Sequence, residues 1–178
     1  MRKAEQEMLE QVLASVNQLL APRAKEFREW DVAGEMPPAF IEELKSFGLF
    51  GLIIPEEFGG MGFGSAAYSR VLQEIARHDG SVALTVGAHS SIGMRGLLLF
   101  GTPEQKKRWL PRMATGELIG AIAMTEPGAG SDLQGVKTRA DKDGNQYRIN
   151  GSKTFITNGQ LANLIIVVTK TDPSKGAK

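Results

Sequence analysis

The spacing of apolar residues changes once along this chain, near Gly116, from intervals of three and four to intervals of about two. Intervals of three and four are typical of amphipathic helices, and an interval of two is typical of strands with one buried face. The pattern therefore predicts an α+β protein, with an all-α helical domain over residues 1–116 and strands over residues 117–178. A chain of this length forms one domain or two small ones.

Five helices are expected in the first region. Their apolar faces place them at residues 5–20, 38–47, 65–78, 81–100 and 103 onward. Pro22 is expected to end or kink the first helix, and the second should bury Phe47 with its other apolar residues. Residues 81–100 are apolar on most sides and rich in small residues, which favours one central helix. Thr102-Pro103-Glu104-Gln105 is typical of a helix start with a capping box, and this last helix should bury Trp109.

Five strands are expected in the second region. They are residues 118–125, 137–140, 146–150, 152–157 and 164–169. Asp143-Gly144 lies between the second and third of these runs and is typical of a hairpin turn. The chain closes with a polar stretch, Asp172 to Lys178, which is expected to be a loop.

The composition excludes several kinds of function. Lysine plus arginine number 21 and aspartate plus glutamate number 20, so no net field favours a nucleic acid or an anionic membrane surface. The absence of cysteine excludes disulfides, thiolate metal sites and a cysteine nucleophile. His78 and His89 each lack a second histidine at ligand spacing, so we expect packing or capping roles for them and no metal site.

The sequence favours a cytoplasmic protein without a membrane span. The first ten residues contain three glutamates and no apolar core, unlike a secretory signal or a transit peptide. The longest uninterrupted apolar runs, Leu97–Phe100 and Leu164–Val168, are far shorter than the roughly 20 residues that cross a bilayer.

The segment from Glu126 to Asp132 has the composition of an anion-binding loop. Gly128 and Gly130 let the backbone turn so that successive N–H groups face one concavity, and Ser131 adds a hydroxyl donor. The spacing matches neither a Rossmann fingerprint nor a P-loop. Taken alone, the loop is equally compatible with a tight turn between strands.

A second segment, Phe155 to Gly159, favours a bound planar group. On a strand, Phe155 and Thr157 would project to the same face and offer an aromatic ring beside a hydroxyl. Met124 and Thr125, which end the strand before the glycine loop, would supply hydrogen bonds to the edge of such a ring. Phe155 alone favours core packing, whereas the two segments together favour a cofactor site with the parts that a flavin dinucleotide needs.

These segments resemble the flavin-binding segments of acyl-CoA dehydrogenases. The resemblance rests on Ala121–Asp132, Ile149–Lys153 and Phe155–Gly159, and extends back through Pro55–Gly60 and Gly101–Lys107. It covers nearly the whole chain. Ala121–Gly135 is most similar to long-chain members, and Gly87–Gly93 to very-long-chain members.

The resemblance implies a site for FAD. Thr125 would bond the edge of the flavin, and Ser131 would serve the pyrophosphate and the CoA side of the substrate. Phe155 occupies the place of a tryptophan that lies against the isoalloxazine in many relatives, and Thr157 would reach flavin N5. The cofactor-binding residues implied in this way are Ile122, Met124, Thr125, Gly130, Ser131, Phe155, Ile156 and Thr157.

The resemblance also implies a reaction, the α,β-dehydrogenation of a fatty acyl-CoA, with electrons passed to an electron-transferring flavoprotein by a homodimer or homotetramer. In this family the α-proton is removed by a glutamate of a C-terminal helical domain, which follows tyrosine or phenylalanine and precedes Gly-Thr. No tyrosine or phenylalanine of this chain is followed by Glu-Gly-Thr. We therefore expect no catalytic residue in the chain, and Glu126 is a poor substitute because it precedes Pro127 in the phosphate loop.

The family's middle domain is β-barrel-like and longer than residues 117–178, so this chain is expected to be the N-terminal part of an enzyme and inactive by itself. Leu164–Val168 is apolar throughout and requires cover on both faces, which predicts a stable helical half and a marginal β half. Two alternatives stay open. One is an acyl-CoA oxidase or nitroalkane-oxidase-like flavoenzyme of the same fold, and the other is a non-catalytic binding or assembly fragment.

Overall fold

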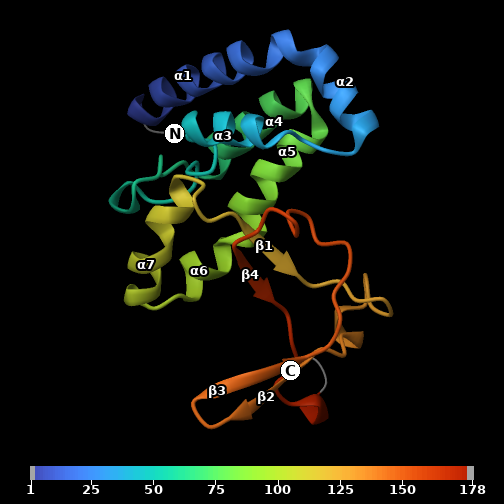
Figure 1. The fold of residues 1–178 in the computed structure, drawn as a ribbon. Coiled ribbons are helices and arrows are strands. Elements are labelled where there is room, and N and C mark those ends of the chain that lie inside the picture. The colour runs from blue at the N-terminus through green and yellow to red at the C-terminus, as the bar shows by residue number, and fades with distance from the viewer. Residues whose placement is uncertain (1–2, 176–178) are drawn as a thin grey trace.

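A computed structural model describes residues 3–175 of the protein (Figure 1). The helices are α1 (Lys3–Leu20), α2 (Ala24–Ala33), α3 (Pro38–Ser46), α4 (Ser65–His78), α5 (Gly80–Gly87), α6 (Arg95–Phe100) and α7 (Pro103–Ala114). The strands are β1 (Gly120–Ala123), β2 (Arg139–Asp143), β3 (Gln146–Asn150) and β4 (Leu164–Val167). Within the described residues every α-helix precedes the strands, which confirms the predicted α+β class.

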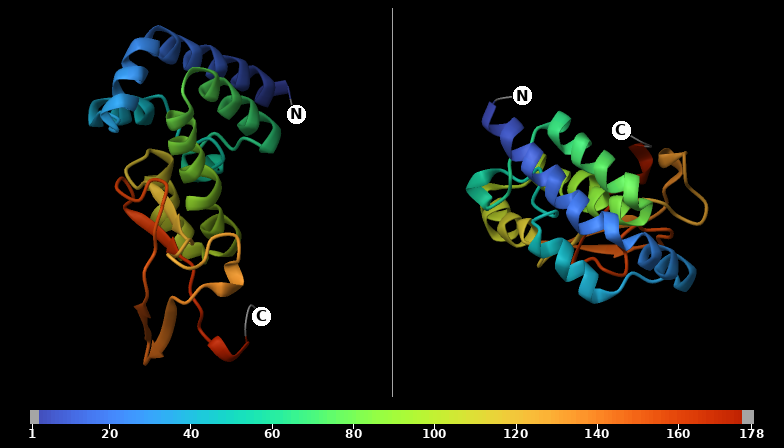
Figure 2. Two further views of the ribbon diagram at one scale, coloured as in Figure 1. Left: turned by 90° about the vertical axis from the view of Figure 1, so that its right-hand side faces the viewer. Right: turned by 90° about the horizontal axis from the view of Figure 1, so that it is seen from above.

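The helical part has an apolar core of its own. Helix α1 lies across α4, and α4 packs against α5 (Figures 1 and 2). The side chains that are fully buried in this core include Val16 and Leu20 of α1, Val71 and Ile75 of α4, and Val82 of α5. Burial of one such side chain stabilises a fold by about 1.5–3 kcal/mol, so these contacts hold the helices together.

The chain between α1 and α4 differs from the prediction in two places. Pro22 lies in a 3₁₀ turn, η1 (Ala21–Arg23), which kinks the chain, and the helix α2 follows it without having been expected. Only Phe27 of α2 is buried, so no apolar stripe repeats along that helix. The expectation that Phe47 is buried is wrong, because α3 ends one residue before it and Gly48 turns the chain with φ +70°, leaving Phe47 40% exposed.

Two helix starts follow from local side-chain caps. Asp79 accepts a hydrogen bond from the Val82 N–H at 2.8 Å and so begins α5 directly after α4. The capping box predicted for α7 is confirmed, since Thr102 and Gln105 each bond the other's backbone N–H through a side-chain oxygen. Trp109 of this helix is half-buried rather than buried.

Residues 81–100 form two helices rather than the single helix expected. Helices α5 and α6 are joined by η3 (Ala88–Gly93), a turn of π-helix that packs against β1. A Cβ atom added to Gly93 would lie 2.5 Å from the carbonyl carbon of Gly120. Only a residue without a side chain fits at this contact. Strand β1 therefore lies against the helical part at η3, where the α-helical hydrogen-bond pattern is interrupted.

The same stretch, Gly80–Phe100, is long and apolar enough to cross a membrane when judged by length and composition alone. Half of it is buried inside the structure, and the core helix of a water-soluble protein passes the same test. The apolar run noted in this stretch, Leu97–Phe100, is shorter because Arg95 and Gly96 precede it.

The strands form two separate pairs. β1 and β4 are parallel, with Gly120 opposite Leu164 and Ala123 opposite Val167. β2 and β3 form the antiparallel hairpin that the sequence predicts, and Gly144 adopts φ +61° in its turn. This hairpin projects from the end of the molecule that lies away from α1 (Figure 2).

The predicted strand over residues 152–157 is not formed. Its backbone is irregular, and Phe155 and Asn158 adopt left-handed φ values of +55° and +63°. The inference that alternation along a strand places Phe155 and Thr157 on one face is therefore wrong. Of the predicted C-terminal loop, η5 (Pro173–Lys175) is a 3₁₀ turn, and residues 176–178 lie outside the described residues.

Candidate functional site

The two segments that the motifs associate with a cofactor meet just beyond the end of β1. The Thr154 N–H donates to the carbonyl oxygen of Thr125 at 3.0 Å. Ile122, Met124 and Thr125 are each half-buried along this edge. The structure therefore brings the start of the glycine loop beside the residue that precedes Phe155.

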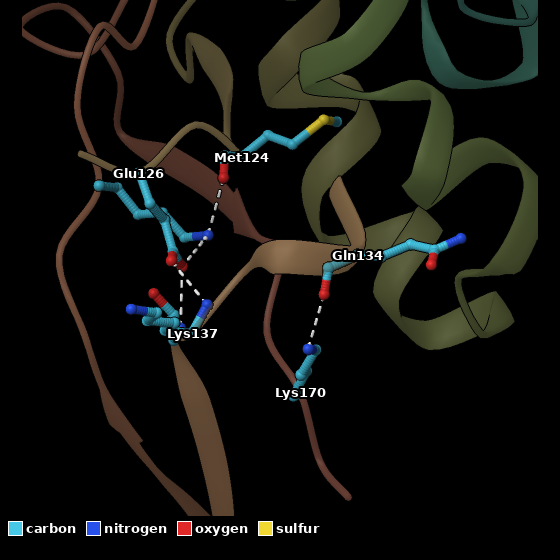
Figure 3. A network of polar contacts seen from close by, with 7 residues as sticks. Met124, Glu126, Gln134, Lys137 and Lys170 are labelled. Carbon is cyan, nitrogen blue, oxygen red and sulfur yellow. Dashed lines mark hydrogen bonds and ion pairs between the residues drawn. The ribbon is translucent and has the colours of Figure 1, made fainter. Parts of the chain in front are cut away.

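An ion pair whose side chains are 11% and 6% exposed connects the same two segments (Figure 3). Lys153 Nζ lies 2.9 Å from Glu126 Oε1 and donates to the Met124 carbonyl oxygen at 2.8 Å. The Glu126 carboxylate also accepts from the Lys137 N–H at 2.6 Å and from the Thr138 N–H at 2.8 Å. One carboxylate thus holds together the end of β1, the chain that enters β2 and the segment that follows β3.

The surroundings of Glu126 keep it ionised. The nearby Thr138 hydroxyl and the Lys137 N–H, followed by Lys153 and the Thr138 N–H, lower the pKa of Glu126 from 4.5 to about 2, although desolvation opposes them. A carboxylate of this kind is a weak proton acceptor at neutral pH. Glu126 is therefore unsuited to removing a substrate proton, as the sequence also suggests.

The glycine loop leaves backbone donors free. Glu126 and Ala129 exchange two backbone hydrogen bonds, at 2.9 and 3.1 Å, which close a tight turn. Within residues 3–175, the N–H groups of Gly128, Gly130 and Ser131 have no hydrogen-bond partner. Nothing lies within 4 Å of the position that a Cβ atom would take on either glycine. Consecutive free N–H groups in an open loop are suited to binding a phosphate.

Phe155 presents its ring to the surface. It is 90% exposed, so the core-packing alternative for this residue is wrong. Thr157 is also exposed, and Ile156 between them is half-buried. The Asn158 amide donates to the Thr85 carbonyl oxygen of α5 at 2.9 Å and anchors the segment on the helical part. An exposed ring on an anchored segment is suited to covering a flat ligand.

Two residues that shape this site were not identified from the sequence. Lys153 is the only charged residue within residues 149–169, which is a signal that it has an acidic partner elsewhere, because buried lysines are almost always paired. The signal for Asn158 is its residue type, since asparagine adopts a left-handed backbone more readily than most residues. Neither signal reveals which residue is the partner.

Known protein families match both parts of the chain. Residues 3–117 match the N-terminal domain of acyl-CoA dehydrogenases, and residues 121–178 match the middle domain of acyl-CoA dehydrogenases. The chain belongs to the acyl-CoA dehydrogenase family. The family identification made from the motifs is confirmed, and the glycine loop and the Phe155 segment both lie in the part that matches the middle domain.

Individual acyl-CoA dehydrogenases show how much of the family's length this chain represents. Human mitochondrial very long-chain specific acyl-CoA dehydrogenase is 45% identical over 139 residues, which are 75% of this chain and 21% of that protein. Mitochondrial isovaleryl-CoA dehydrogenase of Pongo abelii is 41% identical over 171 residues, which are 94% of this chain and 40% of that protein. An acyl-CoA dehydrogenase of Bacillus anthracis, solved in complex with FAD, matches with a TM-score of 0.78 and 34% identity over 96% of this chain and 30% of its own. This acyl-CoA dehydrogenase chain thus spans less than half the length of each of these relatives.

Proposed function

We propose that this chain forms the helical domain and the first flavin-binding strands of an FAD-dependent acyl-CoA dehydrogenase. The observation that carries the proposal is the backbone hydrogen bond between Thr154 and Thr125, which joins the two motifs at one place. The buried pair of Lys153 and Glu126 beside it fixes the distance between them. Two segments that are distant in the sequence thus offer one composite binding surface.

The residues of this surface fit FAD in two respects. The free N–H groups at Gly130 and Ser131 are suited to a pyrophosphate, because they donate hydrogen bonds without a competing protein acceptor. The exposed ring of Phe155 offers apolar cover to an isoalloxazine, and the hydroxyls of Thr125 and Thr157 would bond its edge. Bound FAD would supply the oxidant, and the residues of this chain would bind and orient it.

The proposed substrate is a fatty acyl-CoA, and the proposed electron acceptor is an electron-transferring flavoprotein. The exposed Ser131 would contact the CoA side of the substrate as well as the cofactor. The residue that removes the substrate proton would come from outside these 178 residues, since Glu126 is already engaged and its pKa is about 2. A homodimer or homotetramer is the proposed assembly.

Titration of the purified chain with FAD tests this proposal. We expect saturable binding with quenching of the flavin fluorescence. Phe155→Ala should weaken binding about tenfold, because the flavin ring loses its aromatic cover. Phe100→Ala is the control, since it removes a ring of similar exposure from α6 and should leave binding unchanged. No saturable binding, or equal affinity of wild type and Phe155→Ala, would overturn the proposal.

A further inference from the structure

His89 joins the helical part to the first strand of the candidate site. It lies in η3 and is fully buried. Its Nε2 is 3.1 Å from the carbonyl oxygen of Phe50, and the Gly120 N–H donates to its Nδ1 at 2.9 Å. The imidazole also packs edge-on against the Phe50 ring, with 5.1 Å between the ring centroids. One side chain thus connects the loop after α3 with the first residue of β1.

The two hydrogen bonds determine which nitrogen of His89 carries the hydrogen. A backbone carbonyl only accepts, so Nε2 must donate to Phe50, and a backbone N–H only donates, so Nδ1 must be unprotonated. Burial lowers the pKa of His89 from 6.5 to about 4, although the Phe50 carbonyl favours the protonated ring. At neutral pH the ring is therefore uncharged, with one donor and one acceptor in fixed places.

The bond to Gly120 lies where β1 is placed most tightly. A Cβ atom on Gly120 would lie 2.8 Å from the Gly93 carbonyl oxygen, and one on Gly93 would lie 2.5 Å from the Gly120 carbonyl carbon. Gly120 begins the strand that leads directly to Met124 and Thr125. A displacement of Gly120 would therefore be transmitted along β1 to these two residues.

We propose that His89 is a positioning residue, which places β1 through its bond to the Gly120 N–H and so sets the position of Met124 and Thr125 at the flavin site. The ligand in this statement rests on the proposed function, whereas the placement of β1 does not. The bond to Phe50 holds the imidazole in its orientation. The bond to Gly120 fixes the strand, so the two bonds have separable effects.

Substitutions at His89 separate the two bonds. Asparagine places its side-chain oxygen near the position of Nδ1, so His89→Asn keeps an acceptor for Gly120 and loses the donor to Phe50. Glutamine places its amide nitrogen near the position of Nε2, so His89→Gln keeps the donor and loses the acceptor. His89→Ala removes both groups. His78→Gln is the matched control, because His78 lies in α4, where its Nε2 is 3.4 Å from Glu74 Oε1.

The readout is amide hydrogen exchange in the flavin-free chain, measured by NMR at Gly120 relative to Ile75 in the helical core. We expect His89→Gln to speed exchange at Gly120 about tenfold relative to Ile75, as loss of one buried hydrogen bond implies, and His89→Asn to keep it within about threefold of wild type. His89→Ala should match His89→Gln, and His78→Gln should match wild type. FAD affinity should fall most in His89→Gln and His89→Ala and little in His89→Asn, and His78→Gln should keep the wild-type affinity.

Equal changes in His89→Asn and His89→Gln would overturn the proposal, as would a change at Ile75 as large as that at Gly120. Either result would show that His89 contributes only to general stability. Failure of the wild-type chain to bind FAD would instead contradict the proposed function. The exchange rates at Gly120 would still decide whether His89 positions β1.

Discussion

Phe40 in the helical core is 2% exposed and packs edge-on against Phe27, whereas Phe155 in the segment after β3 is 90% exposed. The core around Phe40 is shaped by the burial of apolar side chains. The segment around Phe155 is shaped by polar contacts, chiefly the pair of Lys153 and Glu126. One region therefore keeps its form by excluding water, and the other keeps its form while leaving its aromatic ring accessible.

This contrast separates the residues that stabilise the fold from those that we propose bind FAD. Removal of a buried ring leaves a cavity, whereas removal of an exposed ring removes few contacts that stabilise the ligand-free protein. Phe40 and Phe155 are the same residue type in opposite surroundings. Stability and flavin affinity should therefore respond to different substitutions.

The largest expected effect is in the core. Phe40→Ala should lower the free energy of unfolding by about 3–5 kcal/mol, because it leaves a cavity among packed aromatic rings. Phe100→Ala, which removes a ring that is 86% exposed, should change it by less than about 0.5 kcal/mol. Urea unfolding followed by circular dichroism measures both variants. Similar losses in the two variants would show that burial does not distinguish them.

A somewhat smaller effect is expected at His89, which joins the helical part to β1. Its pKa is about 4 in the folded chain, below the ordinary value of 6.5, so the unfolded chain binds a proton at a higher pH than the folded one. The stabilisation is complete above pH 6.5 and is lost as the pH falls from 6.5 to 4. Over this range the free energy of unfolding should fall by about 3 kcal/mol more in wild type than in His89→Asn.

Glu126 provides an internal reference for this pH profile. Its pKa is about 2 in the folded chain, below the ordinary value of 4.5, so its stabilisation is present above pH 4.5 and is lost only as the pH falls from 4.5 to 2. His89→Asn should leave this lower part of the profile unchanged. Parallel profiles of wild type and His89→Asn between pH 6.5 and 4 would contradict the assignment of a neutral His89.

The smallest loss of stability in the helical core is expected when the ion pair of Lys153 and Glu126 is broken. This change should nevertheless weaken the binding of FAD. Lys153→Met removes the partner of Glu126 and releases the chain before Phe155, so FAD affinity should fall about tenfold while the helical content stays unchanged. Arg148→Met is the control, because its pair with Asp143 is exposed to solvent. Isothermal titration calorimetry compares the variants. Equal loss in both would mean that the buried pair does not hold the segment.

The sequence predicts the helical part better than the site. α4 and α7 follow from apolar spacing and from the capping box at Thr102, because both signals are local. α2 escapes this reasoning since Phe27 alone is buried in it. The break at η3 lies against Gly120, which is distant in the sequence, and no local pattern indicates this contact.

At the site, the motifs predict which residues take part but not how the backbone places them. The segment around Phe155 was expected as a strand, yet Lys153 and Asn158 anchor it on partners that are distant in the sequence and give it a left-handed turn. The family and the α+β class are confirmed. The domain boundary after residue 116, the individual cofactor contacts, the cytoplasmic location and the oligomeric state stay predictions.

Hydrogen exchange with and without FAD tests whether the two segments form one flavin site. Saturating FAD should slow exchange in residues 124–131 and in residues 153–158 together, while α4 keeps the exchange rates of the free chain. Joint protection with the same dependence on FAD concentration is the predicted result. Protection of one segment without the other, or of neither, would contradict a shared site.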